Sequence, residues 1–359
     1  MKVLVFPKSQ NPYQELLYAP LRDQGVTITY LIPLTGSHIL GLIFLIPQLI
    51  LYKINGYNIF HIHWFYTFQL TVSNLLFQNI ITRVFFTFYF IIFILTIKVL
   101  NFKLIWTIHN LSQHTNHFIL EKRIVAFVGK TSNILIIHSP SIQKNLGKMG
   151  INESKIHIMQ MGNYNIYPNT ISQNVARSIL KINKKSFVIT YFGKIEKYKG
   201  VMELIDAFQQ LELSDSILII AGECVNNQLK KALLDKINNT VSIKHYIRFI
   251  PNNDIQLYIQ AANITICPYL KVTTSSTAYL YLAFNKPLIY PLLGNLIDLP
   301  DNIGFPYNPY EKDSLKKCIL LAYNKNSNLI KMNESINKFK ESISWYASAQ
   351  SLLSIYNLL

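Results

Sequence analysis

The chain has 359 residues, half of them hydrophobic, and carries a formal net charge of +16 with a sequence pI near 9.5. This length predicts about two domains, each with enough apolar residues for a core. The charge indicates an anionic partner such as nucleic acid, acidic lipid or a phosphorylated substrate. No helix-turn-helix, zinc-finger or RNA-recognition signature is present, so we expect no nucleic-acid partner. Three widely spaced cysteines exclude a disulfide framework and a zinc site and favour a reducing compartment.

The chain opens with a strand, a helix and a second strand. Residues 2–6 and 26–31 have the apolar patterns of strands, and apolar side chains recur at helical spacing between them. The G-x-G-x-x-G sequence is absent, which argues against a dinucleotide site. The first apolar run is too short for a signal peptide and meets Pro7 early, so we expect a cytoplasmic protein.

Residues 59–64, IFHIHW, are predicted to form a strand with two histidines at its end. Alternation places His61 and His63 on the same face of that strand. A metal pair is one interpretation, but no third cysteine, aspartate or glutamate lies nearby in the sequence. We therefore favour a strand end at which one histidine faces a cleft.

Residues 84–100 form the most apolar segment, with Lys98 as its one charge and Arg83 just before it. Its length is at the lower limit for crossing a bilayer, so a spanning helix stays an alternative. A further strand is predicted at residues 104–109, and a spanning helix would divide one sheet across the membrane. We therefore favour a helix in or beside the N-terminal domain that touches the membrane surface, as in a peripheral protein.

Residues 104–117, LIWTIHNLSQHTNH, end a predicted strand in histidines. His109 and Asn110 come directly after the apolar run, and His114 and His117 follow in the loop. Histidines at this position fit acid–base chemistry, although plain surface-loop histidines fit the same pattern.

Residues 188–223 are predicted to form strand, basic glycine turn, helix and strand. Two strands joined by a helix are usually parallel, so the first turn lies at the carboxyl end of a strand, where α/β sheets bind ligands. The turn between Gly193 and Gly200 contains Lys194, Lys197 and Lys199. Lysines next to a helix N-terminus suit a diphosphate, although a solvated basic turn would look the same.

The spacing of this turn resembles the G-[RK]-x-x-x-x-K-G element of GT-B glycosyltransferases, especially the GT4-like group. The resemblance implies that Lys194 and Lys199, together with Gly193, hold the diphosphate of a nucleotide sugar. Lys194 stands where the family usually has arginine, so a bidentate contact is lost. The implied fold class is α/β with two Rossmann-like domains facing across a cleft. Their expected bounds are 1–163 for acceptor binding and 164–340 for the nucleotide sugar, with a helix at 341–359 that packs back on the first domain.

The segment from Pro268 to Pro287 keeps the family's spacing but departs from its chemistry. The family's Glu-x7-Glu acids fall on Val272 and Leu280. A hydroxyl-rich run leads into a helix instead, and hydroxyls with free backbone N–H groups form an anion site, although they also make a plain helix cap. The residues expected at the diphosphate are Thr274, Ser275, Ser276 and Thr277. This run moves the resemblance toward a smaller inverting subgroup, similar to bacterial exopolysaccharide glycosyltransferases that lack the acids.

The resemblance also implies roles outside these two loops. A strand predicted at residues 244–250 would place Ile250 and Pro251 at the nucleobase. The W-T-x-H-N sequence resembles the N-domain loop of the family, with His109 as our first choice for the catalytic base and His63 as the second. The residues expected on the acceptor side are Asn11, Tyr13, Asn110 and His114.

The sequence therefore predicts a bacterial glycosyltransferase. It would move a sugar from a nucleotide-diphosphate sugar to a lipid-linked or polysaccharide acceptor in exopolysaccharide, capsule or lipopolysaccharide synthesis. No D-x-D triplet occurs, so we expect neither a metal nor another cofactor. The expected location is the cytoplasm, at the inner face of the plasma membrane. The alternative is a catalytically inactive, membrane-associated binding or scaffold protein on the same fold, since the two acids are missing.

Overall fold

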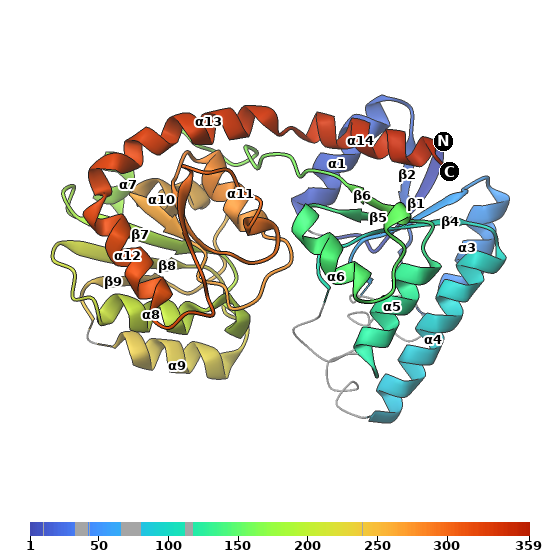
Figure 1. Cartoon of the computed structure of the whole chain (residues 1–359), viewed down its shortest axis with the longest axis horizontal. Coiled ribbons are helices and arrows are strands. Elements are labelled where there is room, and N and C mark those ends of the chain that lie inside the picture. Colours follow the sequence, from blue (N-terminus) through green and yellow to red (C-terminus); the bar gives the residue numbers. More distant parts are fainter. Residues whose placement is uncertain (10, 33–41, 43, 66–79, 112–117, 239) are drawn as a thin grey trace. The chain divides into compact units, whose positions relative to one another are not determined.

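The structure is a computed structural model that describes residues 1–9, 11–32, 42, 44–65, 80–111, 118–238 and 240–359 (Figure 1). The chain forms two compact units. Unit 1 is Met1–Gly162 together with Ser344–Leu359, and unit 2 is Asn163–Ile343. The sequence placed these boundaries after residues 163 and 340. Each unit is described by itself below.

Unit 1 contains a parallel six-stranded sheet in the order β2-β1-β3-β4-β5-β6. Its inner strands are continuous apolar runs, as expected for strands that are covered on both faces. The order reverses between β1 and β3, because β2 lies on one side of β1 and every later strand lies on the other. The strands are β1 (Lys2–Phe6), β2 (Thr27–Tyr30), β3 (Ile59–Ile62), β4 (Lys103–Thr107), β5 (Ile134–Ile137) and β6 (Ile156–Ile158).

Successive side chains of these strands point to opposite faces of the sheet, so the core of unit 1 lies on both faces. Phe60 and Trp106 belong to the hydrophobic core that α3, α4 and α5 complete. His61 and Thr107 point to the other face, toward α1 and α14, which pack on each other. The main helices of unit 1 are α1 (Pro12–Asp23), α3 (Leu45–Ile54), α4 (Ile80–Val99), α5 (Glu121–Thr131), α6 (Gln143–Gly147) and α14 (Trp345–Asn357).

Unit 2 contains a second parallel six-stranded sheet in the order β12-β11-β10-β7-β8-β9. Its order reverses between β7 and β10. The strands are β7 (Phe187–Phe192), β8 (Ser216–Ala221), β9 (Ile243–Tyr246), β10 (Ile264–Ile266), β11 (Leu288–Pro291) and β12 (Gly304–Tyr307). The helices are α7 (Gln173–Ile179), α8 (Val201–Gln209), α9 (Asn227–Ile237), α10 (Ile255–Ala261), α11 (Ser276–Ala283), α12 (Ser314–Asn324) and α13 (Met332–Ser342).

Two predicted elements differ from the structure. The strand expected at residues 244–250 ends at Tyr246, because its only neighbour β8 ends at Ala221, the residue paired with Tyr246, and Gly222 then turns away with φ 143°. The single helix expected at residues 341–359 is divided. α13 ends at Ser342 and α14 begins at Trp345, since Ser344 is extended and its side chain caps the backbone N–H of Ala347.

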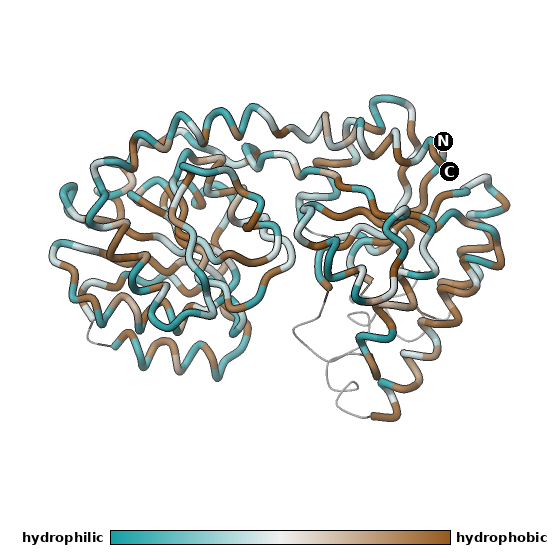
Figure 2. The backbone as a smooth tube through the Cα atoms, in the orientation of Figure 1, coloured by the Kyte–Doolittle hydropathy of each residue, from teal (hydrophilic) through white to brown (hydrophobic). Residues whose placement is uncertain are grey.

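Helix α4 exposes a long apolar stripe. Within the described residues it is the one helix long and apolar enough to cross a membrane, and 33% of its apolar window is buried. The tube in Figure 2 is brown along much of this helix. The exposed side chains recur every three or four residues, which places them on one helical face. The stripe consists of Ile81, Phe85, Phe88, Ile92, Leu95 and Val99, and Ile80 and Val84 are exposed beside it.

Candidate functional site

The loops after β7 and β10 meet at the point in unit 2 where the strand order reverses. The backbone N–H of Leu270 donates to the carbonyl of Tyr198 at 2.9 Å. Gly200 has φ 67°, and a Cβ there would lie 1.9 Å from the carbonyl oxygen of Pro268. Ligands of open parallel sheets bind beside such a reversal, at the carboxyl ends of the strands. These loops carry the residues that the sequence assigns to the diphosphate.

The start of α11 lies beside the loop after β7. Ser275 caps this helix through its side chain, and its own N–H donates to Asn295 Oδ1 at 2.8 Å. A Cβ on Gly193 would lie 3.8 Å from Thr277 Oγ1, so the β7 loop touches the first turn of the helix. Thr274 Oγ1 is buried and has no hydrogen-bond partner in the described part of the chain. Hydroxyls and helix N–H groups here can receive an anion.

The two lysines of the β7 loop have different surroundings. Lys199 is half-buried, with Nζ 4.0 Å from the ring centroid of Tyr269, and desolvation lowers its pKa. The hydroxyl of Tyr269 lies 3.4 Å from Ser275 Oγ, so this ring joins Lys199 to the start of α11. Lys194 is exposed, and its carbonyl accepts a 2.6 Å hydrogen bond from the hydroxyl of Tyr191. A cation that is already partly desolvated pairs with phosphate more strongly than one in water.

Replacing Gly200 by alanine should destabilise unit 2 more than replacing Gly193. Both glycines have positive φ, so each substitution adds backbone strain of about 1–2 kcal/mol. Only at Gly200 would the new Cβ collide with a backbone carbonyl, whereas at Gly193 it makes ordinary contacts. Thermal unfolding of Gly200→Ala beside Gly193→Ala measures the difference. Equal melting temperatures would contradict the close packing of the two loops.

The residues expected at the nucleobase lie after β9, at the same edge of the sheet. Ile250 is buried and Pro251 is exposed, both in the loop that leads to α10. Sequence reasoning missed two aromatic residues of this region, Tyr269 and Tyr164. Burial raises the pKa of Tyr164, and the neighbouring Ser276 opposes that rise. Tyr164 lies outside any pattern, and Tyr269 lies in the Pro268–Pro287 segment, whose spacing gives this ring no role.

Histidines gather in unit 1 at the carboxyl ends of β3 and β4. His109 Nε2 lies 3.1 Å from His63 Nδ1, and His63 Nε2 lies 2.6 Å from the hydroxyl of Tyr18. That hydroxyl lies 3.0 Å from His61 Nδ1, and His61 Nε2 lies 2.7 Å from Thr107 Oγ1. We call these five residues the histidine chain. Its members come from α1, β3, β4 and the loops after the two strands.

Burial keeps these histidines neutral. Desolvation lowers the pKa of His61 to about 3 and that of His138 to about 4. Desolvation and the neighbouring histidines place the pKa values of His63 and His109 well below the ordinary range. A neutral imidazole has one nitrogen with a lone pair, which can accept a proton from a substrate hydroxyl.

Aromatic rings surround His109. The ring of Trp64 stacks on it at 4.1 Å, and the ring of Tyr13 meets it edge-on at 4.7 Å. The ring of His138 lies 5.3 Å away; its Nδ1 bonds to the carbonyl of Met159, and its Nε2 is buried without a partner among the described residues. These rings leave His109 only 7% exposed to solvent.

The other residues expected on the acceptor side are spread out. Asn11 is exposed and caps α1 by accepting from the backbone N–H of Tyr13 at 3.0 Å. Asn110 is half-buried directly after His109. His114 lies outside the described residues, as does His117.

The metal-pair interpretation of His61 and His63 finds no third ligand in the structure. Within the described residues, no group of three or more histidine, cysteine, aspartate or glutamate side chains is placed to hold a metal ion. Both ring nitrogens of His61 face hydroxyl groups.

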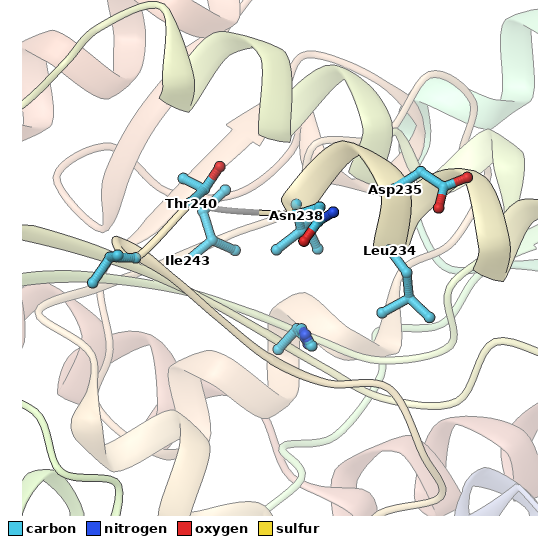
Figure 3. A pocket seen from close by; sticks show the side chains of 8 residues that line it. Leu234, Asp235, Asn238, Thr240 and Ile243 are labelled. Atoms are coloured by element: carbon cyan, nitrogen blue, oxygen red, sulfur yellow. The ribbon is translucent and has the colours of Figure 1, made fainter.

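A cavity of about 490 Å³ lies elsewhere in unit 2. Its lining side chains are drawn in Figure 3. It lies between the last turn of α9 and the start of β9, lined by side chains that include Leu234, Asn238 and Ile243. This is the amino end of an edge strand, away from the loops after β7 and β10. Its lining contains no lysine or arginine, so it does not suit a diphosphate.

Comparison with known proteins places these sites in a family context. Residues 172–339 match the family model for glycosyl transferases group 1. No curated protein matches the chain. Sucrose-phosphate synthase from Thermosynechococcus elongatus has a similar structure, with a TM-score of 0.77 at 15% identity over 99% of this chain and 98% of that one.

Two further solved structures are similar over nearly their full lengths. HepE from Anabaena, in complex with UDP and glucose, has a TM-score of 0.75 at 15% identity and covers 100% of both chains. The catalytic domain of starch synthase IV from Arabidopsis thaliana, bound to ADP and acarbose, has a TM-score of 0.71 at 11% identity over 99% of this chain and 98% of that one. The chain thus has the two-domain GT-B fold predicted from its sequence, and residues 172–339 match the group 1 glycosyl transferase model.

Proposed function

We propose that the chain moves a sugar from a nucleotide-diphosphate sugar to a lipid-linked or polysaccharide acceptor during bacterial cell-surface glycan synthesis. Exopolysaccharide, capsule and lipopolysaccharide are the product classes. The observation that carries the proposal is the meeting of the Lys199 loop with the hydroxyl-rich start of α11 at the reversal of the unit 2 sheet. HepE is described in complex with UDP-glucose, and starch synthase IV with ADP. These bound nucleotides support a nucleotide-sugar donor here.

The proposed chemistry needs a base and a site for the leaving group. The Nδ1 of His109 takes the proton of the acceptor hydroxyl while the acceptor oxygen bonds to the sugar carbon. The bond from that carbon to the diphosphate breaks, and the nucleoside diphosphate leaves with the electron pair. Lys194, Lys199 and the N–H groups at the start of α11 stabilise its charge. With these groups at the diphosphate, we expect the reaction to run without a metal ion.

Replacing Lys199 by alanine should weaken binding of the donor. A charge-assisted contact to phosphate contributes about 1.5–3 kcal/mol, so the dissociation constant should rise about tenfold to a hundredfold. Titration calorimetry with UDP, GDP and ADP, and then with the sugar nucleotide of the base that binds, measures this change. Lys197→Ala is the matched control, because Lys197 is an exposed lysine of the same loop. Unchanged affinity in Lys199→Ala would remove Lys199 from the site.

The apolar stripe on α4 supports attachment to the inner face of the plasma membrane. Basic side chains lie near both ends of the helix, with Arg83 at the first turn and Lys98 at the last. An exposed apolar face flanked by basic charge favours the surface of an anionic bilayer. A protein held there would meet a lipid-linked acceptor.

The membrane proposal predicts salt-sensitive, reversible binding to vesicles. The protein should float with vesicles containing phosphatidylglycerol and should be released from cell membranes by alkaline carbonate. Phe85→Ser with Phe88→Ser should abolish flotation, while Ile330→Ser, at an exposed isoleucine of unit 2, should not change it. Retention after carbonate extraction would instead support a spanning helix.

A further inference from the structure

The hydrogen bonds of the histidine chain can all be donated in the same direction along it. Each neutral imidazole carries one N–H group, and each bond of the chain joins two atoms that can donate or accept. Fixing the direction of one bond fixes the others when the hydrogen of Tyr18 points to His61 or His63 and not to the neighbouring hydroxyl of Tyr356. The chain runs either from His109 toward Thr107 or from Thr107 toward His109. A threonine hydroxyl at the far end can serve both directions, because its hydrogen rotates.

The two directions give His109 opposite properties. When the chain runs toward Thr107, His109 Nε2–H donates to His63, and the lone pair stays on His109 Nδ1. When it runs the other way, His109 Nδ1 carries the hydrogen and cannot accept a proton. Because His109 bonds to His63 through Nε2, Nδ1 is the nitrogen that remains for a substrate. The tautomer thus decides whether His109 is a base or a hydrogen-bond donor.

We propose that Tyr18 is a positioning residue for His109, acting through His63. Its hydroxyl donates to His61 Nδ1 and accepts from His63 Nε2–H, which makes His63 Nδ1 the acceptor for His109 Nε2–H. This assignment rests on the proposed role of His109 as the base. Tyr18 is suited to it because its hydroxyl lies 3.0 Å from His61 Nδ1 and 2.6 Å from His63 Nε2, between the two histidines. Its ring is fully buried, so the contact is held in place.

Tyr356 provides a matched comparison. Its hydroxyl reaches the same atom, His61 Nδ1, at 2.7 Å, and it comes from α14. Its ring contacts His61 edge-on, and its hydroxyl also bonds to the hydroxyl of Tyr18. Its loss nevertheless leaves the contacts of Tyr18 with His61 and His63 in place. The other titratable groups that face the chain are Tyr13, Tyr30 and His138. All of these are neutral near pH 7, so they add no charge to the line.

The test compares Tyr18→Phe with Tyr356→Phe in the full chain. Nitrogen-15 NMR of labelled histidines reads the tautomers directly and needs no substrate. The wild type and Tyr356→Phe should show His109 protonated on Nε2, and Tyr18→Phe should show a mixture on His63 and His109. In Tyr18→Phe, kcat should fall at least about tenfold, with KM for the nucleotide sugar within about twofold, and the pH profile of kcat should shift. Tyr356→Phe should stay within about twofold of the wild type.

Three outcomes would overturn the proposal. They are a hydrogen on His109 Nδ1 in the wild type, tautomers in Tyr18→Phe that equal those of the wild type whatever the change in kcat, and a tautomer change in Tyr18→Phe that leaves kcat within about twofold of the wild type. Circular dichroism and melting temperature establish that both variants are folded. If the protein uses no sugar nucleotide, the proposed function fails, while the NMR comparison still decides whether Tyr18 sets the tautomer.

Discussion

Replacing His109 by glutamine is expected to lower kcat about 100-fold to 10,000-fold. This is the usual contribution of a positioned general base. The glutamine amide can keep a hydrogen bond to His63 Nδ1 and fill the space beneath Trp64, so the variant removes the basic lone pair and little else. Binding of the nucleotide sugar should not change, because Lys199 and the start of α11 lie in unit 2.

The measurement is nucleoside diphosphate release with the donor selected by calorimetry, together with the affinity for that donor. His157→Gln is the control, a partly exposed histidine on β6 of the same unit. A kcat for His109→Gln within threefold of the wild type would show that another group takes the proton. His63 would then be the next residue to replace, as the sequence suggested.

Lowering the pH from 7 to 5 is expected to destabilise unit 1 strongly. The pKa of His138 is about 4 and that of His61 about 3 in the folded protein, both below their ordinary value of 6.5. Below pH 6.5 the unfolded chain therefore binds protons that the folded chain does not. Stability is complete above that pH and falls until the folded pKa is reached. Each of these histidines should remove about 2 kcal/mol by pH 5.

Denaturant unfolding between pH 7 and 4 measures this loss. His138→Asn should lose less unfolding free energy between pH 7 and 4 than the wild type, because asparagine does not titrate in this range. Its amide can still donate to the carbonyl of Met159. His245→Asn, at an exposed histidine on β9 of unit 2, should lose as much unfolding free energy at low pH as the wild type. If His138→Asn loses as much unfolding free energy at low pH as the wild type, His138 is not a buried neutral histidine.

Most of the fold could be predicted from the sequence because the strands are buried on both faces. Runs such as residues 188–192 and 217–221 have few alternatives to a parallel strand when a helical period lies between them. The errors fall where tertiary context decides. The end of β9 depends on where β8 stops, and the break before α14 depends on the cap at Ser344. Neither depends on local propensity.

The site could be predicted in part. Glycine spacing marked the β7 loop, and the run of hydroxyls marked the start of α11, because close approach and helix capping require particular residue types. The histidine chain could not be predicted. Tyr18 lies on α1 and Thr107 inside β4, and only the packing of α1 against the sheet brings them to His61. His61 and Thr107 are next to each other only through the β3–β4 pairing.

The discontinuity of unit 1 has a consequence for how the protein is made. The segment Ser344–Leu359 belongs to unit 1 but follows the whole of unit 2 in the chain. It supplies Tyr356 to His61 and Trp345 to Tyr13. During translation the ribosome must therefore finish unit 2 before α14 can close over the histidines. Until α14 is synthesised, the contacts of Trp345 and Tyr356 with unit 1 are missing. Unit 1 begins first in the chain but can complete its fold only after unit 2 has been synthesised.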